Sequence, residues 1–135
     1  MRTALDSSVL LDVLGADPLF GARSREALRA AHDAGALVVS EVVWAEVRAH
    51  FASDDSFREA LRVLGVQFDP ISPRAAELAG SLWLESRRAG RRPRGRVVAD
   101  FLIGAHARLQ ADALLSRDRG FYRRYFRQLN LIDPS

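Results

Sequence analysis

The sequence contains no cysteine, and this absence excludes disulfide bonds and thiolate ligands for a metal ion. It contains no lysine either, because all twenty basic side chains are arginine. No run of residues is long and apolar enough to cross a membrane. Arg2 is followed closely by Asp6, and no secretory signal-peptide pattern is present. We therefore expect a cytoplasmic protein with no membrane partner.

The overall composition is that of a folded protein. The chain has 135 residues, of which 48% are apolar and 27% are charged. This balance is typical of a globular domain, and the length is sufficient to bury a core. Neither internal repeats nor a linker divides the sequence, so we expect one domain over residues 1–135.

Arginine is concentrated in two parts of the chain. Six of the ten residues from 87 to 96 are arginine. A second group lies near the C-terminus and consists of Arg117, Arg119, Arg123, Arg124 and Arg127. Basic clusters suit a polyanionic partner such as the phosphate backbone of a nucleic acid. A solvated surface loop has the same composition, so the clusters alone leave both interpretations open.

Short apolar segments alternate with amphipathic segments of helical period along the whole chain. The segments expected to be strands are 2–5, 36–40, 66–71, 112–116 and 129–133. This alternation predicts an α/β fold, a three-layer sandwich with a central, mostly parallel sheet of four to five strands and helices on both faces. In such sheets ligands bind at the carboxyl ends of the strands.

Four acidic residues take positions that this sheet would bring to one edge. Asp6 comes directly after predicted strand 2–5, and Asp118 follows predicted strand 112–116 after one residue. Glu46 lies in the first two turns of the helix that follows strand 36–40. Asp100 lies in the first turns of the helix before strand 112–116.

Asp100 stands in an otherwise apolar stretch, VVADFLIGAHA (residues 97–107). Helical spacing places it on the same side as Ile103 and Ala107, which is the side expected to pack. Burying a lone carboxylate is costly, so a cation is expected beside it. That cation is either a metal ion or the guanidinium of Arg96, four residues earlier.

A metal ion explains the four acids together. Clustered carboxylates repel one another unless a cation lies between them. Mg²⁺ or Mn²⁺ fits, because hard cations prefer oxygen ligands and the chain offers no thiolate. One or two such ions can activate a water for phosphodiester hydrolysis. Taken singly, each acid is better explained as a capping or ion-paired residue, and only their joint placement favours the metal.

Four stretches in this order and spacing carry a family resemblance: ALDSSVLLDVL, VSEVVWAEV, VVADFLIGAHA and LLSRDRGFY. They resemble the PIN-domain ribonucleases, and most closely the VapC-type toxins of toxin–antitoxin pairs. The resemblance implies that Asp6, Glu46, Asp100 and Asp118 are the catalytic, metal-binding acids. It further implies that Ser8 contacts the metal shell or a phosphate, and that Ser116 orients the last acid by a hydrogen bond.

The same resemblance implies a Mg²⁺- or Mn²⁺-dependent endonuclease that cleaves structured RNA such as tRNA or rRNA. It implies a homodimer and a small VapB-type antitoxin whose tail blocks the active site. Within this function, the candidates for holding the RNA backbone are Arg92, Arg94, Arg96 and Arg119.

Two other assignments depend on weaker patterns. Asp12 lies six residues after Asp6, which is not on the same face of a helix, so we expect it at the surface. Tyr122, Tyr125 and Phe126 have a spacing that suits either base stacking or ordinary packing.

Two families with a phospho-acceptor acid also place that acid after the first strand of an α/β sheet. They are the response-regulator receiver domains and the haloacid-dehalogenase phosphatases, and both rely on a lysine that this chain lacks. The remaining alternative is a non-catalytic RNA-binding or scaffold protein on the same fold. Against it, four acids without a metal would repel the phosphates that the arginines attract.

Overall fold

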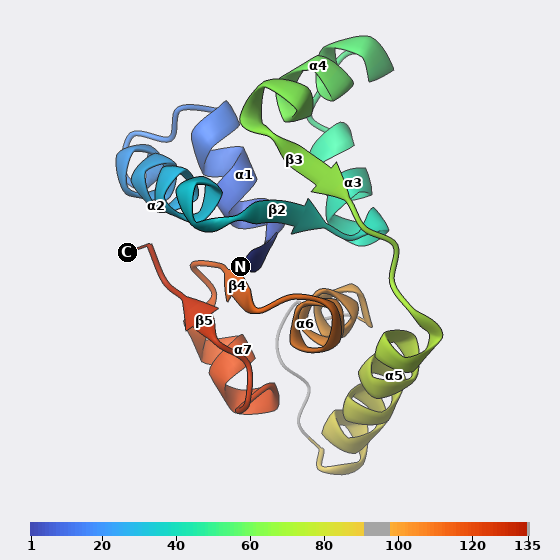
Figure 1. The fold of residues 1–135 in the computed structure, drawn as a ribbon. Helices are drawn as coiled ribbons and strands as arrows, with labels where there is room; N and C mark the ends of the chain where they lie inside the picture. The colour runs from blue at the N-terminus through green and yellow to red at the C-terminus, as the bar shows by residue number, and fades with distance from the viewer. Residues whose placement is uncertain (91–97, 135) are drawn as a thin grey trace.

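Five parallel strands form one sheet at the centre of the computed structural model, which describes residues 1–90 and 98–134 (Figure 1). In chain order the strands are β1 (Arg2–Leu5), β2 (Ala36–Val39), β3 (Val66–Phe68), β4 (Ala113–Leu115) and β5 (Leu131–Ile132). Their order across the sheet is β3-β2-β1-β4-β5, and every neighbouring pair is parallel. The predicted α/β sandwich with a parallel sheet is confirmed.

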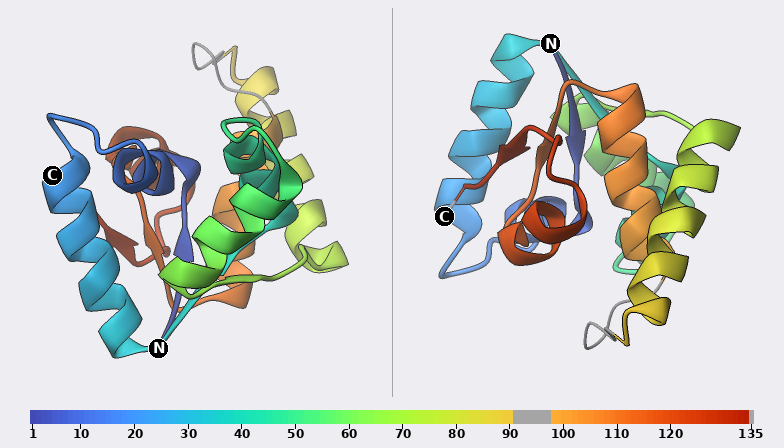
Figure 2. Two further views of the ribbon diagram at one scale, coloured as in Figure 1. Left: turned by 90° about the horizontal axis from the view of Figure 1, so that it is seen from above. Right: turned by 90° about the horizontal axis from the view of Figure 1, so that it is seen from below.

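Helices cover both faces of this sheet. They are α1 (Ser7–Leu14), α2 (Gly21–Ala34), α3 (Glu41–Arg48), α4 (Asp54–Leu64), α5 (Pro73–Arg88), α6 (Val98–Gln110) and α7 (Arg119–Tyr125). Helices α1, α2 and α4 lie on one side, and α6 and α7 lie on the other, with α5 packed against α6 (Figures 1 and 2). Helix α3 contacts both α1 and α6.

Local sequence signals set the helix boundaries. The Ser53 hydroxyl accepts a hydrogen bond from the backbone N–H of Ser56 and caps α4, while Ser72 caps α5, whose first residue is Pro73. Helix α4 ends at Gly65, whose φ of 73° lies in the left-handed region that favours glycine.

Strands β2 and β4 are apolar along their whole length because both of their faces are covered. Strand β2 is buried at Leu37, Val38 and Val39, and strand β4 is buried throughout. On the α6 side, Gly104 allows a very close approach, since a Cβ there would lie 2.3 Å from the ring of Phe126.

The strand order creates a switch point beside the central strand. From β1 the chain proceeds to β2 and β3 on one side, and β4 and β5 lie on the other side. Open parallel sheets bind ligands outside the carboxyl ends of the strands at such a point. Asp6 directly follows β1, and Asp118 follows the neighbouring β4 after two residues, so both lie at this edge.

Strand β1 has its predicted bounds, and the other four strands are shorter than predicted, β3 and β5 by three residues each. Strand β3 ends at Phe68 instead of residue 71, because Pro70 has no N–H to donate to a strand ladder. Strand β5 covers only residues 131 and 132.

Within the described ranges, no helix combines the length and apolar character needed to cross a membrane.

Candidate carboxylate site

Hydrogen bonds to both oxygens hold the carboxylate of Asp6 in one orientation. The residue is only 8% exposed and is the N-cap of α1. Its Oδ1 accepts a hydrogen bond from the backbone N–H of Ser7 at 2.8 Å. Its Oδ2 accepts from the hydroxyl of Ser116 at 2.7 Å and from the hydroxyl of Tyr122 at 3.4 Å. The carboxylate is therefore oriented before any ligand arrives.

Ser116 connects Asp6 to Asp118. The serine is fully buried, and its hydroxyl also accepts a hydrogen bond from the backbone N–H of Asp118 at 3.0 Å. Its own N–H donates to the carbonyl of Ile132 on β5, which fixes the serine beside the strand. Asp118 is half-buried and stands at the N-cap of α7. A single side chain thus sets the spacing of the two strand-end acids.

Glu46 and Asp100 approach the same edge from helices. Glu46 projects from the exposed side of α3, and Asp100 is half-buried in the first turn of α6. Asp6 interacts electrostatically with Asp100 and Asp118, and Glu46 interacts with Asp6 and Asp100. The structure therefore brings together all four acids that the sequence singled out.

Burial and mutual repulsion make this cluster unfavourable when all its members are ionised. Burial raises the pKa of Asp6 above its ordinary value, the hydrogen bonds from Ser116 and Ser7 oppose this, and the charges of Asp118 and Asp100 add to the rise. Partial desolvation also raises the pKa of Glu46, although the residue as a whole is exposed, and the charges of Asp6 and Asp100 contribute. A cation at this edge would relieve both effects.

The donor set fits a hard divalent cation. All four acids offer carboxylate oxygens, the ligands that Mg²⁺ and Mn²⁺ prefer. Two residues after Asp6, the buried hydroxyl of Ser8 has no hydrogen-bond partner among the described residues. In residues 1–90 and 98–134, no three acidic or histidine side chains are already close enough to enclose an ion. The site is thus a converging set of donors and not a closed cage.

The arginines predicted to hold RNA are only partly placed. Arg92, Arg94 and Arg96 lie outside the described residues, as does the alternative pairing of Asp100 with Arg96. Arg119 begins α7 directly after Asp118. Its side chain is 62% exposed and forms an ion pair with Asp133 at 3.3 Å.

One feature of the site differs from the sequence prediction, and a second decides between two interpretations that the sequence left open. Asp12 is not at the surface: it is 4% exposed and forms a two-point ion pair with Arg117, with N–O distances of 2.6 and 3.0 Å. Tyr122 and Phe126 are buried, so they pack in the core and are not platforms for bases. The hydroxyl of Tyr122 donates to Asp6, a contact that the sequence prediction missed. The signal for it is that Tyr122 lies one helical turn after Asp118 and so faces the same edge of the sheet.

The raised pKa of Asp6 gives a testable pH dependence. At pH values below its ordinary pKa of 3.8, Asp6 is protonated in both the folded and the unfolded chain and contributes nothing. As pH rises, the unfolded chain releases this proton first, so the folded protein loses stability until its own raised pKa is passed. Asp6→Asn removes this loss while retaining an acceptor oxygen. We expect EDTA-treated Asp6→Asn to have a higher thermal midpoint than the parent at pH 7, with the difference narrowing toward pH 4.

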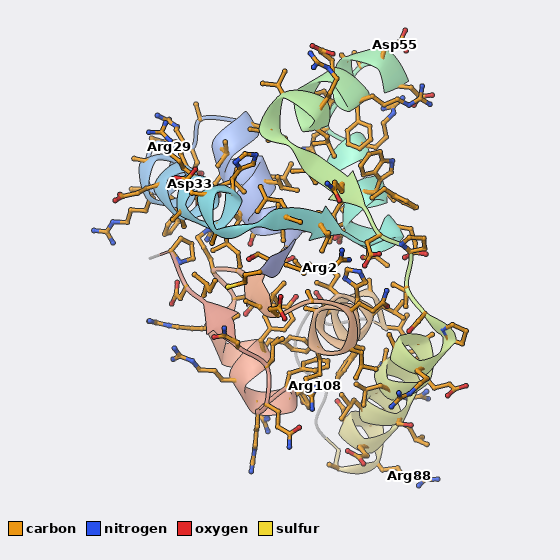
Figure 3. The ribbon with its side chains drawn as sticks, viewed as in Figure 1. Arg2, Arg29, Asp33, Asp55, Arg88 and Arg108 are labelled. Atoms are coloured by element: carbon orange, nitrogen blue, oxygen red, sulfur yellow. The ribbon has the colours of Figure 1, made fainter. Side chains whose placement is uncertain are left out.

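A matched control separates this effect from any loss of negative charge. Asp33 lies in the last turn of α2, which leads to the amino end of β2 and not to the carboxylate site (Figure 3). Thermal unfolding of Asp33→Asn should follow the parent at every pH. A lower thermal midpoint for Asp6→Asn than for the parent at pH 7 would contradict the predicted loss of stability from ionised Asp6.

Comparison with known proteins identifies the fold family. Residues 3–127 match the family described as PIN domain. A search of curated protein sequences finds no match.

Solved structures of toxin–antitoxin proteins are similar over nearly the full chain. VapBC2 from Rickettsia felis, bound to a DNA fragment from its promoter, has 17% identity and a TM-score of 0.76, and the match covers 98% of each chain. DNA-bound VapBC from Salmonella typhimurium has 15% identity and a TM-score of 0.73, over 100% of this chain and 99% of the other. VapBC-5 from Mycobacterium tuberculosis has 22% identity and a TM-score of 0.59, over 98% of each chain. At these identities the similarity shows a shared fold.

Proposed function

The chain belongs to the PIN-domain family, and we propose that it is a divalent-metal-dependent endoribonuclease that acts as the toxin of a toxin–antitoxin pair. One observation carries the proposal. Four carboxylates from separate parts of the chain (Asp6, Glu46, Asp100 and Asp118) converge at the switch point of a parallel sheet. Their mutual repulsion favours a cation between them, and a divalent cation is what a PIN-domain nuclease would need for hydrolysis.

In this proposal the four acids hold one or two Mg²⁺ or Mn²⁺ ions. When bound, such an ion activates a water and stabilises the negative charge that develops on a phosphodiester. The chain supplies orientation: Ser116 and Tyr122 hold Asp6, and Ser116 also fixes the turn that carries Asp118. Ser8 adds a buried hydroxyl near Asp6 that is available to a ligand of the site.

The proposed substrate is structured RNA, such as tRNA or rRNA. Arg119 directly follows Asp118, which supports a role in holding the RNA backbone next to the site. We assign the same role to Arg92, Arg94 and Arg96 from their place in the sequence. These contacts carry no base specificity by themselves.

The proposed partner is a small VapB-type antitoxin. Similar structures include VapBC complexes and one described as a toxin–antitoxin complex from Klebsiella pneumoniae. We further propose that residues 1–135 act as a single domain, and that two copies form a homodimer in the cytoplasm.

The proposal is tested by incubating the purified chain with total cellular RNA, with Mg²⁺, with Mn²⁺ and with EDTA. Asp100→Asn, which keeps the shape of the side chain and removes its charge, is tested in parallel with Asp33→Asn as the control. We expect discrete, metal-dependent cleavage by the parent and by Asp33→Asn, and none by Asp100→Asn.

Two results would contradict the proposal. Equal cleavage by Asp100→Asn would indicate a contaminating nuclease and remove the role of the carboxylates. RNA binding that weakens steeply with salt, without cleavage by any variant, would favour a non-catalytic RNA-binding protein.

A further inference from the structure

Arg117 lies between two residues of the carboxylate site but points away from it. Its neighbours in the chain are Ser116, which bonds to Asp6, and Asp118 itself. The guanidinium instead donates to both carboxylate oxygens of Asp12, with Nε–Oδ2 at 2.6 Å and Nη2–Oδ1 at 3.0 Å. Asp12 lies on α1, 105 residues earlier in the chain. A cation that could neutralise the site is thus bound elsewhere.

The surroundings of Asp12 form a specific receptor for this guanidinium. The Asp12 side chain is 5% exposed, and its Oδ2 also accepts a hydrogen bond from the hydroxyl of Ser24 on α2 at 2.8 Å. The Arg117 guanidinium lies 4.0 Å from the ring centroid of Phe20, a cation–π distance. Two-point pairing and stacking are contacts that a planar guanidinium makes well.

Without Asp12, three other carboxylates near the guanidinium could pair with it. Arg117 already interacts electrostatically with Asp6 and Asp17, and Asp118 is the next residue in the chain. Asp17 lies in the loop before α2, where its Oδ1 accepts from the backbone N–H groups of Leu19 and Phe20. Asp6 and Asp118 belong to the carboxylate site. An arginine bound there would occupy the place of a metal ion.

We propose that Asp12 is a positioning residue that holds the Arg117 guanidinium outside the carboxylate site and so leaves that site to a divalent cation. This inference depends on the metal-binding part of the proposed function. It differs from a purely structural role, in which the ion pair only anchors the turn between β4 and α7. The two roles predict opposite results when the arginine is removed together with Asp12.

The test compares Mn²⁺ affinity, measured by calorimetry and by electron paramagnetic resonance of free Mn²⁺, in the parent and three variants: Asp12→Asn, Arg117→Gln and the double variant. Asp12→Asn removes the charge that binds the guanidinium and one of its two acceptor oxygens. We expect the Mn²⁺ affinity of this variant to fall about tenfold or more, as competition by a nearby unit charge can cause. In the double variant the competing cation is gone, so affinity should return to within about threefold of the parent. Asp17→Asn, a change to the other acid near Arg117, should bind Mn²⁺ like the parent.

The thermal midpoint of each variant is also measured in EDTA, to separate a change in Mn²⁺ affinity from a loss of stability. Arg117→Gln is expected to lower stability, because it leaves Asp12 buried without its cation. The double variant removes both charges and avoids this problem. Parent-like affinity of Asp12→Asn would overturn the inference, and so would a double variant as weak as Asp12→Asn. If the parent chain itself does not bind Mn²⁺, the proposed function fails and the inference fails with it.

Discussion

Asp6→Asn is expected to abolish metal-dependent RNA cleavage, with kcat/KM reduced by at least about 10³-fold, since even one lost hydrogen-bond donor to a transition state costs about 10²–10³-fold. Asp6 is the most buried of the four acids and interacts with the other three. The change removes one negative charge and keeps an acceptor for Ser7. The amide NH2 group then faces the hydroxyls of Ser116 and Tyr122 that donate to Oδ2 in the parent, so the thermal midpoint is needed to separate the loss of charge from a loss of orientation.

Stability measurements make this prediction specific. A ligand that binds only the folded chain raises its stability according to concentration and affinity. Added Mn²⁺ should raise the thermal midpoint of the parent and of Asp33→Asn but not that of Asp6→Asn. Residual cleavage above about one tenth of the parent rate, with an unchanged Mn²⁺ response, would show that Asp6 is not part of a metal site.

The strand-end acids could be predicted from the sequence because one rule places them. Asp6 and Asp118 each follow a short apolar segment, and parallel strands bring their carboxyl ends to one edge. Glu46 and Asp100 required a second step. Glu46 is placed by its position in the first two turns of the helix after strand 36–40, and Asp100 by the helical spacing that puts it on the packed side of its helix. In each case the information lies within about ten residues of the acid.

The pairing of Asp12 with Arg117 could not be predicted in this way. Helical spacing correctly separates Asp12 from Asp6, but it does not say what Asp12 meets. Its partner is 105 residues away, and Ser24 and Phe20 come from the following loop and helix. A buried acid and a distant arginine are recognised only when the sheet has aligned α1 with the turn after β4.

The lengths of the edge strands also depend on distant neighbours. Strands β3 and β5 each have one strand partner, while the central β1 has two. An edge segment such as residues 69–71 has apolar and β-branched neighbours but no second strand to keep it extended. The chain turns away there at Pro70, which the pattern of apolar residues alone does not indicate.

Phe101 provides the link between the core and the site. It follows Asp100 in α6, is fully buried, and lies 5.1 Å from the ring of Phe121 and 5.2 Å from the ring of Tyr125. Both partners belong to α7, the helix that begins immediately after Asp118. The aromatic cluster therefore joins α6, which carries Asp100 in its first turn, to α7, which begins directly after Asp118.

Phe101→Ala is expected to lower the free energy of unfolding by about 3–5 kcal/mol, the usual cost of deleting a fully buried aromatic ring. This is a large share of the roughly 5–15 kcal/mol that stabilises a typical domain. Phe101→Leu fills most of the space and should cost less than about 1.5 kcal/mol. Urea unfolding in EDTA gives both values, and Leu109→Ala, at a 37% exposed position of the same helix, should change stability by less than about 1 kcal/mol.

The same variants show whether this packing also serves the site. If the ring cluster holds Asp100 opposite Asp118, folded Phe101→Ala should bind Mn²⁺ more weakly than Phe101→Leu, at a urea concentration where both remain folded. Leu109→Ala should bind like the parent, because Leu109 lies near the other end of α6 from Asp100, at a partly exposed position. Equal Mn²⁺ affinity for Phe101→Ala and the parent would show that α6 keeps Asp100 in place without this contact, through its packing at Gly104 and against α5.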